Sequence, residues 1–124
     1  MSDYDHALTL EILKQIQRSI ITIKKRFEPV TSADDFTNSE AGLEKLDAIC
    51  MQLIAIGESL KNLDKVTNKS LLAKYTEVDW KKAKGLRDII SHHYFDLNAE
   101  AIFDVCANHL DNLEFTINKI IKDL

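Results

Sequence analysis

Apolar residues recur every three or four positions along most of this chain, a spacing that gathers them on one face of an α-helix. Residues 7–27 show the pattern most simply, in a stripe made by Leu8, Ile12, Ile16, Ile20, Ile23 and Phe27. We expect an amphipathic helix of about six turns here, with that stripe buried. Pro29 ends this helix, because proline has no backbone N–H to donate and restricts the residue before it.

A broader apolar pattern covers residues 39–63, where two stripes lie side by side. They contain Leu43, Leu46, Cys50, Leu53, Gly57 and Leu60, and next to them Ile49, Ile56 and Leu63. Two stripes predict a helix near the centre of a bundle, and its glycine allows a neighbouring helix to approach closely. In the connector before this helix, Ser32, Asp34 and Asp35 are candidate caps, and Phe36 is expected to anchor the connector on the core.

The pattern weakens over residues 62–78, where Leu71, Leu72 and Tyr75 predict at most a short helix. Asp79 then suits the N-cap of a helix that runs from Trp80 towards Tyr94. The expected buried side of that helix consists of Trp80, Ala83, Leu86, Ile89 and Ile90.

Asn98 suits the cap of a last helix that continues to the end of the chain. Its stripe takes steps of three or four residues: Ile102, Cys106, Leu110, Leu113, Ile117, Ile120 and Leu124. Such a stripe serves either packing within an antiparallel bundle or an exposed contact with a partner helix. We therefore expect an all-α fold, an antiparallel four-helix bundle with a short additional helix, in a single domain over residues 1–124.

Composition supports this fold and excludes several classes of enzyme. The 124 residues include three glycines and one proline, so sheet-rich folds with many tight turns are disfavoured. No G-x-G-x-x-G, G-x-x-x-x-G-K-[ST], G-x-S-x-G or H-E-x-x-H pattern is present. Cys50 and Cys106 have no C-x-x-C spacing and are expected to be small buried thiols in a reducing compartment.

The sequence also predicts where the protein resides. No apolar run approaches the about 20 residues of a membrane span, and the first five residues lack the basic start of a signal peptide. We expect a soluble, cytoplasmic protein with no membrane association.

Basic residues gather in one short segment of an otherwise acidic chain. The formal net charge is −4, yet Lys81, Lys82, Lys84 and Arg87 face only one nearby acid, Asp88. This segment would attract an anionic ligand. The alternative is that these lysines form the solvated face of an ordinary helix.

The same segment brings together residues that carry out acid–base chemistry. Asp88 and His92 are four residues apart, so on a helix the carboxylate lies where it can orient the imidazole. Arg87 and His92 are five apart, roughly 140° around a helix, so they converge only through the long arginine side chain, a distorted helix end or a second subunit. This geometry favours a site built at an interface. Arginine binds phosphate and histidine moves protons near neutral pH, which suits phosphodiester cleavage without a metal or other cofactor. The alternative is a structural cluster at a helix end.

The sequence of residues 87–94 resembles the R-x-x-x-x-H-x-Y motif of the HEPN superfamily of helical ribonucleases. The tyrosine at the end of this motif makes it similar to the HepT-like toxin branch of that superfamily. Further landmarks agree in order along nearly the whole chain. They are Phe36, residues 53–58 in the central helix, Trp80, and Tyr94 with Phe95 before the last helix. His93, where relatives often have a small residue, departs from the pattern. It leaves open whether a second imidazole assists catalysis or crowds the site.

The resemblance implies a homodimer in which two motifs form one ribonuclease site, with Arg87 and His92 as catalytic pair, Asp88 in support and no metal. It also implies a type VII toxin–antitoxin system, in which a minimal nucleotidyltransferase antitoxin transfers AMP to Tyr94. Lys81, Lys82 and Lys84 are then candidates for RNA binding. One alternative is a non-catalytic helical dimer that docks the nucleotidyltransferase. Another is a plain structural bundle.

Overall fold

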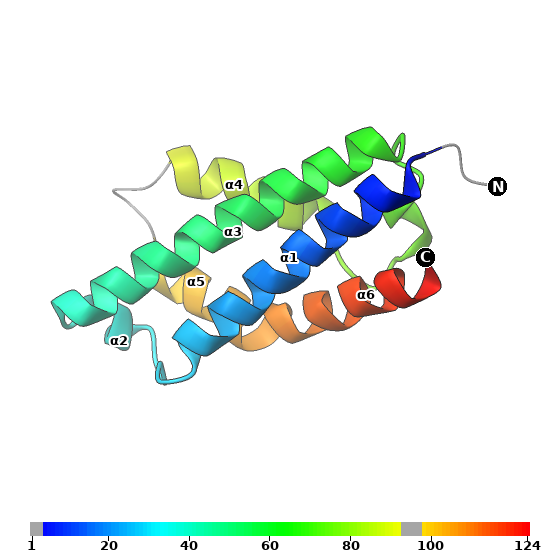
Figure 1. Cartoon of the computed structure of the whole chain (residues 1–124). Coiled ribbons are helices and arrows are strands. Elements are labelled where there is room, and N and C mark those ends of the chain that lie inside the picture. The colour runs from blue at the N-terminus through cyan, green and yellow to red at the C-terminus, as the bar shows by residue number, and fades with distance from the viewer. Residues whose placement is uncertain (1–3, 93–97) are drawn as a thin grey trace.

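A computed structural model describes residues 4–92 and 98–124, and every regular element in that part of the chain is helical (Figure 1). The expected all-α fold is therefore confirmed. The elements in order are α1 (His6–Phe27), α2 (Asp34–Thr37), α3 (Glu40–Val66), the 3₁₀ turn η1 (Leu72–Lys74), α4 (Trp80–His92), α5 (Ala99–Asp104), the π-helical turn η3 (Val105–His109) and α6 (Leu110–Asp123).

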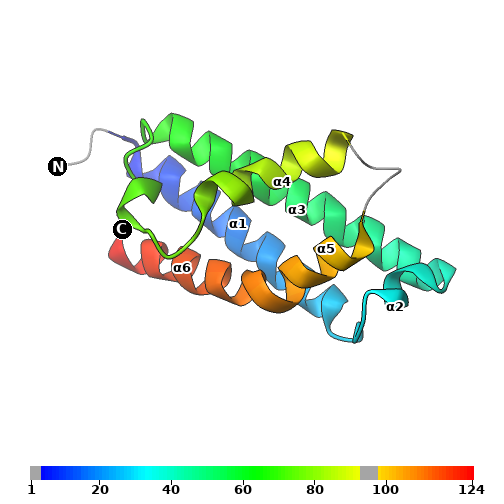
Figure 2. The ribbon, with the colours of Figure 1, turned by 180° about the vertical axis from the view of Figure 1, so that it is seen from behind.

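The long helices alternate in direction and form an antiparallel bundle. α1 packs against α3 on one side and α6 on the other, and α4 packs along the far side of α3 (Figures 1 and 2). The core between them is apolar and includes the fully buried Leu13, Ile16, Ile20, Leu53 and Ile56. This arrangement leaves the α3–α4 contact at one flank of the bundle.

Side-chain caps fix most helix starts where the sequence predicts them. Asp79 Oδ1 accepts a hydrogen bond from Lys82 N at 3.1 Å, and Asn98 Oδ1 accepts one from Glu100 N at 2.9 Å. Both predicted caps are confirmed. The three connector candidates are wrong as helix caps, because α2 has no side-chain cap and α3 is capped by Ser39, which accepts a hydrogen bond from Gly42 N. The Asp35 carboxylate instead accepts hydrogen bonds from the backbone N–H and the hydroxyl of Thr31, which precedes α2 in the chain.

Phe36 anchors the connector as expected. Its side chain is fully buried and its ring lies 6.3 Å from that of Phe27, centroid to centroid. Gly42 lets α2 approach α3, because a Cβ there would lie 2.0 Å from the carbonyl oxygen of Asp35.

Three apolar residues expected in the core are exposed: Leu8, Leu43 and Ile89. Leu8 and Leu43 lie in the first turns of α1 and α3, at helix ends where few neighbours cover them. Ile89 faces away from the core, while the next residue, Ile90, is fully buried. These three expectations are wrong.

The last helix runs without a gap from Ala99 to Asp123 but contains a π-helical turn. This turn, at Val105–His109, lies between α5 and α6, in the region where the apolar stripe takes two successive steps of four. The stripe itself is buried inside the bundle, with Ile117 and Ile120 fully covered. The idea that this stripe is exposed for a partner helix is therefore wrong.

The two cysteines are buried, as the sequence predicts. Cys50 and Cys106 are free and buried, and burial raises the pKa of the first thiol to about 11 and of the second to about 12. Both are therefore protonated thiols at neutral pH. In the described part of the chain, no helix has the length and apolar character needed to cross a membrane.

Candidate functional site

The start of α4 is held firmly against the rest of the bundle. The indole Nε1 of Trp80 donates a hydrogen bond of 2.6 Å to the carbonyl of Tyr75. Just before the helix, the Glu77 carboxylate pairs with Lys119 of α6 at 3.0 Å, and Asn112 donates to the Glu77 carbonyl. These contacts fix the helix that carries the predicted site residues.

α3 and α4 pack closely where Arg87 lies opposite Gly57. A Cβ on Gly57 would lie 3.1 Å from Arg87 Cβ and 3.3 Å from the carbonyl oxygen of Lys84. The close approach predicted for this glycine is confirmed, and the neighbour it admits is the backbone of the motif arginine. The position of Arg87 relative to α3 is thus set by packing.

Two carboxylates hold the Arg87 side chain. Its Nε lies 3.1 Å from Glu58 Oε2 of α3, and its Nη1 donates a hydrogen bond of 3.0 Å to Asp88 Oδ1. Asp88 in turn receives a hydrogen bond of 3.2 Å from Lys61 Nζ. The Arg87 and Lys61 hydrogen bonds hold the pKa of Asp88 below its usual value, so this carboxylate stays charged at neutral pH.

Arg87 stays accessible in spite of these contacts. Its side chain is 42% exposed and retains further N–H donors. We call Glu58, Arg87 and Asp88 the arginine clasp. It presents a fixed cation at the surface, which is the property needed to receive a phosphate group.

Two predicted site residues cannot be placed in the clasp. The backbone of His92 ends α4, but its side chain is not described, and Tyr94 lies outside the described residues. The expected support of His92 by Asp88 therefore stays a prediction. What the structure does give for Asp88 is its contacts to Arg87 and Lys61.

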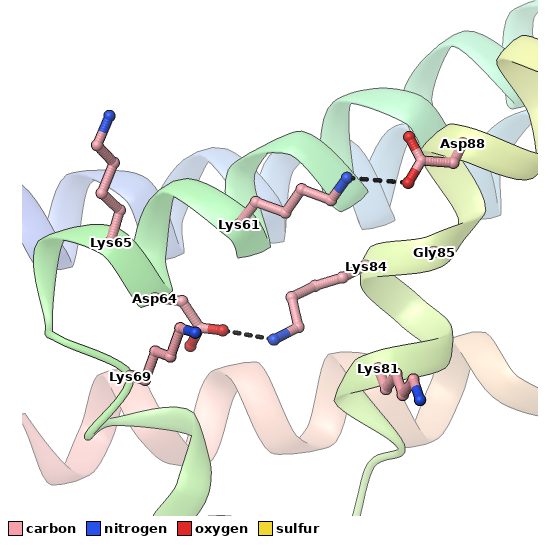
Figure 3. Close-up of a pocket in the computed structure, with 8 residues that line it drawn as sticks. All are labelled: Lys61, Asp64, Lys65, Lys69, Lys81, Lys84, Gly85 and Asp88. Atoms are coloured by element: carbon pink, nitrogen blue, oxygen red, sulfur yellow. Dashed lines mark hydrogen bonds and ion pairs between the residues drawn. The ribbon is translucent and has the colours of Figure 1, made fainter.

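A hollow between α3 and α4 begins beside the clasp (Figure 3). Five lysines and two aspartates line it, a local balance of +3 in a chain whose net charge is −4. We call this hollow the lysine groove. Its lining consists of Lys61, Asp64, Lys65, Lys69, Lys81, Lys84, Gly85 and Asp88.

The three lysines predicted to bind RNA separate in space. Lys81 and Lys84 line the lysine groove, and Lys84 is paired there with Asp64 (Figure 3). Lys82 is not among the lining residues. Its charge contributes to the lowered pKa of Asp104, for which the hydrogen bond from Asn108 is the largest cause. The prediction for Lys82 thus gains no support from the geometry.

The sequence analysis missed Lys61, Lys65 and Lys69 and gave Glu58 no role. The three lysines follow one another at intervals of four in the sequence, which is a detectable charge pattern, although α3 ends before Lys69. Their importance depends on the opposite helix, which the pattern alone does not reveal. No group of three His, Cys, Asp or Glu side chains in residues 4–92 and 98–124 is arranged to hold a metal ion.

Comparison with known proteins connects this geometry to a family. The profile described as "Ribonuclease HepT-like" matches residues 11–120, which include the clasp and the lysine groove. The protein named "Putative RNase MJ0127" of Methanocaldococcus jannaschii is 38% identical over 96 residues, covering 73% of this chain and 76% of the relative.

Two further relatives carry similar names. "Putative RNase TTE0752" of Caldanaerobacter subterraneus is 32% identical over 75 residues, with 60% of this chain and 63% of the relative covered. "Putative RNase MJ1216" of M. jannaschii is 25% identical over 118 residues, with 95% and 88% covered. No solved structure matches this chain.

Proposed function

We propose that this chain, which belongs to the ribonuclease HepT-like family, is an endoribonuclease that works without a metal ion. The observation that carries the proposal is the arginine clasp, an accessible guanidinium fixed at the edge of a basic groove. The ribonuclease names of the relatives support the same reaction.

In the proposed reaction, Arg87 binds a phosphate of the RNA and stabilises the charge that develops on its oxygens. His92 handles the proton as the 2′-hydroxyl oxygen attacks the adjacent phosphorus. The phosphorus–5′-oxygen bond breaks, and the departing oxygen takes up a proton. The products are a 2′,3′-cyclic phosphate and a 5′-hydroxyl, so no protein nucleophile is needed.

Alanine in place of Arg87 tests this proposal. We expect cleavage of single-stranded RNA by the purified protein to fall by about 10²-fold or more, because loss of one preorganised donor to a developing oxyanion has that effect. Arg18→Ala is the matched control, since Arg18 is an exposed arginine on α1. Cleavage by neither protein, with the fold intact, would favour the non-catalytic docking function. Equal cleavage by both would remove Arg87 from the site.

We also propose that the active form is a homodimer with the two motifs facing each other. α4 exposes an apolar side chain next to the clasp. Ile89, which follows Asp88 in the sequence, is 57% exposed. The angular separation of Arg87 and His92 on one helix supports a site completed by a second copy.

Light scattering at micromolar concentration is expected to give the mass of a dimer. Ile89→Glu should shift the mass towards the monomer and lower cleavage, because it puts a charge in the interface. Phe115→Glu, at an apolar residue on α6 that is 67% exposed, should do neither. A monomeric wild-type protein, or an Ile89→Glu variant that stays dimeric and active, would contradict this interface.

The wider biological role follows the family. As a toxin of a type VII toxin–antitoxin pair, the protein would be silenced when its nucleotidyltransferase partner transfers AMP to Tyr94. This regulation rests on the motif tyrosine in the sequence.

A further inference from the structure

Three lysines of the lysine groove are exposed and have no carboxylate partner among the described residues: Lys65, Lys69 and Lys81. The other two basic residues of the groove are neutralised, Lys61 by Asp88 and Lys84 by Asp64. The unpaired charges thus come from the end of α3, the turn after it and the start of α4. All three line one hollow, although Lys81 lies on another helix, beyond the η1 turn.

The turn after α3 adopts a costly conformation that keeps Lys69 in the groove. Asn68 and Lys69 have positive φ angles of 53° and 60°, which residues other than glycine rarely adopt. The Lys69 N–H donates a hydrogen bond of 2.7 Å to the Asp64 carbonyl. This bond folds the chain back against α3, and the Lys69 side chain lines the groove there (Figure 3).

Gly85 leaves one wall of the groove without a side chain. A Cβ at Gly85 would meet no atom within 4 Å, whereas Gly42 and Gly57 are both needed for packing. Glycine within a helix lowers stability, so packing gives no reason for it at this position. A bare backbone suits the close approach of a ligand.

The groove extends from the clasp over a distance that matches a short stretch of RNA. Lys81 precedes Arg87 by six residues on α4, and Lys65 follows Glu58 by seven on α3. At about 1.5 Å per residue both intervals are about 10 Å. Successive phosphates of a stacked strand advance by about 3.4 Å, so the groove accommodates about three.

We propose that the lysine groove binds the sugar-phosphate backbone of the RNA on one side of the bond cleaved at Arg87. It would contact about three phosphates and read no base, because lysines recognise phosphate charge. This inference rests on the proposed ribonuclease function. RNA has a flexible backbone with evenly spaced anions. Such a backbone suits the spaced lysines and the wall that has no side chain at Gly85 better than an acidic protein surface does.

Neutralising the three unpaired lysines tests the proposal. The variant Lys65→Gln, Lys69→Gln, Lys81→Gln is compared with Lys14→Gln, Lys25→Gln, Lys122→Gln, three exposed lysines on α1 and α6. The probe is a fluorescent 12-nucleotide RNA with 2′-O-methyl groups, which cannot be cleaved through its 2′-oxygens. Fluorescence anisotropy gives Kd as a function of salt concentration.

We expect the groove variant to bind RNA about tenfold or more weakly. The slope of log Kd against log salt concentration should be shallower by about 2, since each lysine that neutralises a phosphate contributes about 0.7 to this slope for a single strand. The control should change less than twofold. Gly85→Leu, which leaves the charges in place, should also weaken binding while the Tm is maintained.

Several outcomes would overturn the groove proposal. They are equal effects of the two triple variants, no effect of Gly85→Leu on RNA binding, or retained RNA binding with lost binding of the purified nucleotidyltransferase. Failure of the ribonuclease function is distinguishable, because the wild-type protein would then cleave no RNA. If wild type cleaves and the groove variant binds like the control, only the groove proposal fails.

Discussion

Alanine in place of His92 is expected to slow RNA cleavage by about 10²–10⁴-fold, the contribution of one positioned acid–base group. Imidazole is the motif side chain whose protonation changes near neutral pH. Cleavage by the unchanged protein should continue in excess EDTA, because the proposed reaction needs only Arg87 and His92. Because the pKa of Asp88 is lowered, this carboxylate stays ionised across the histidine range, and the pH profile should report His92.

Initial rates on a single-stranded RNA, measured with and without EDTA between pH 5 and 8, check this expectation. His109→Ala is the matched control, since His109 is an exposed histidine that contacts Asp104 on its own helical segment at 3.3 Å. His93→Ala should have a smaller effect than His92→Ala. Activity that disappears entirely in EDTA, or that persists in full without His92, would refute the mechanism.

Adenylylation of Tyr94 is expected to abolish cleavage. In the transfer, the tyrosine oxygen attacks the α-phosphorus of ATP, pyrophosphate leaves, and the phenol proton passes to a base. The attached AMP brings a phosphate charge two residues from His92, where it would compete with RNA for Arg87. No change of fold is required for this inhibition.

Incubation with the nucleotidyltransferase and ATP, followed by peptide mass spectrometry, should locate one AMP on Tyr94 and a parallel loss of cleavage. Tyr94→Phe should resist both the modification and the silencing, whereas Tyr75→Phe should be silenced like the unchanged protein. Tyr75 is a suitable control because its hydroxyl is already bound to Asp123 at 2.9 Å. Full silencing of Tyr94→Phe would show that another residue is the acceptor.

The spacing of apolar residues along the chain is sufficient to predict most of the fold. Residues of the α1 stripe such as Ile16 and Ile20 are buried as expected, and α1 ends at Phe27 before Pro29. Pattern reasoning failed where the surroundings of a residue decide the outcome. Ile89 has the right position for a helix stripe, but the bundle does not cover it. Likewise, a step of four does not distinguish an α-helix from the π-helical turn at Val105–His109.

The candidate site divides in the same way. Arg87, Asp88 and Lys84 are predictable because they lie close together in sequence. Glu58 and Lys69 are not, because they reach the site only through the packing of α3 on α4. Gly57 shows both what the sequence predicts and what it does not. A small residue in a central stripe predicts close contact with a neighbouring helix, but not the identity of the contacting residue.

The arginine clasp also affects how quickly the site turns over. A free arginine loses up to about 2 kcal/mol of rotamer entropy when it binds a phosphate. In Arg87, contacts at Nε and Nη1 impose much of that loss during folding, before RNA arrives. The same carboxylates repel a bound phosphate equally before and after cleavage, because the RNA diester and the cyclic product each carry one negative charge there. The clasp therefore favours a fixed arginine and ready release over tight retention of RNA.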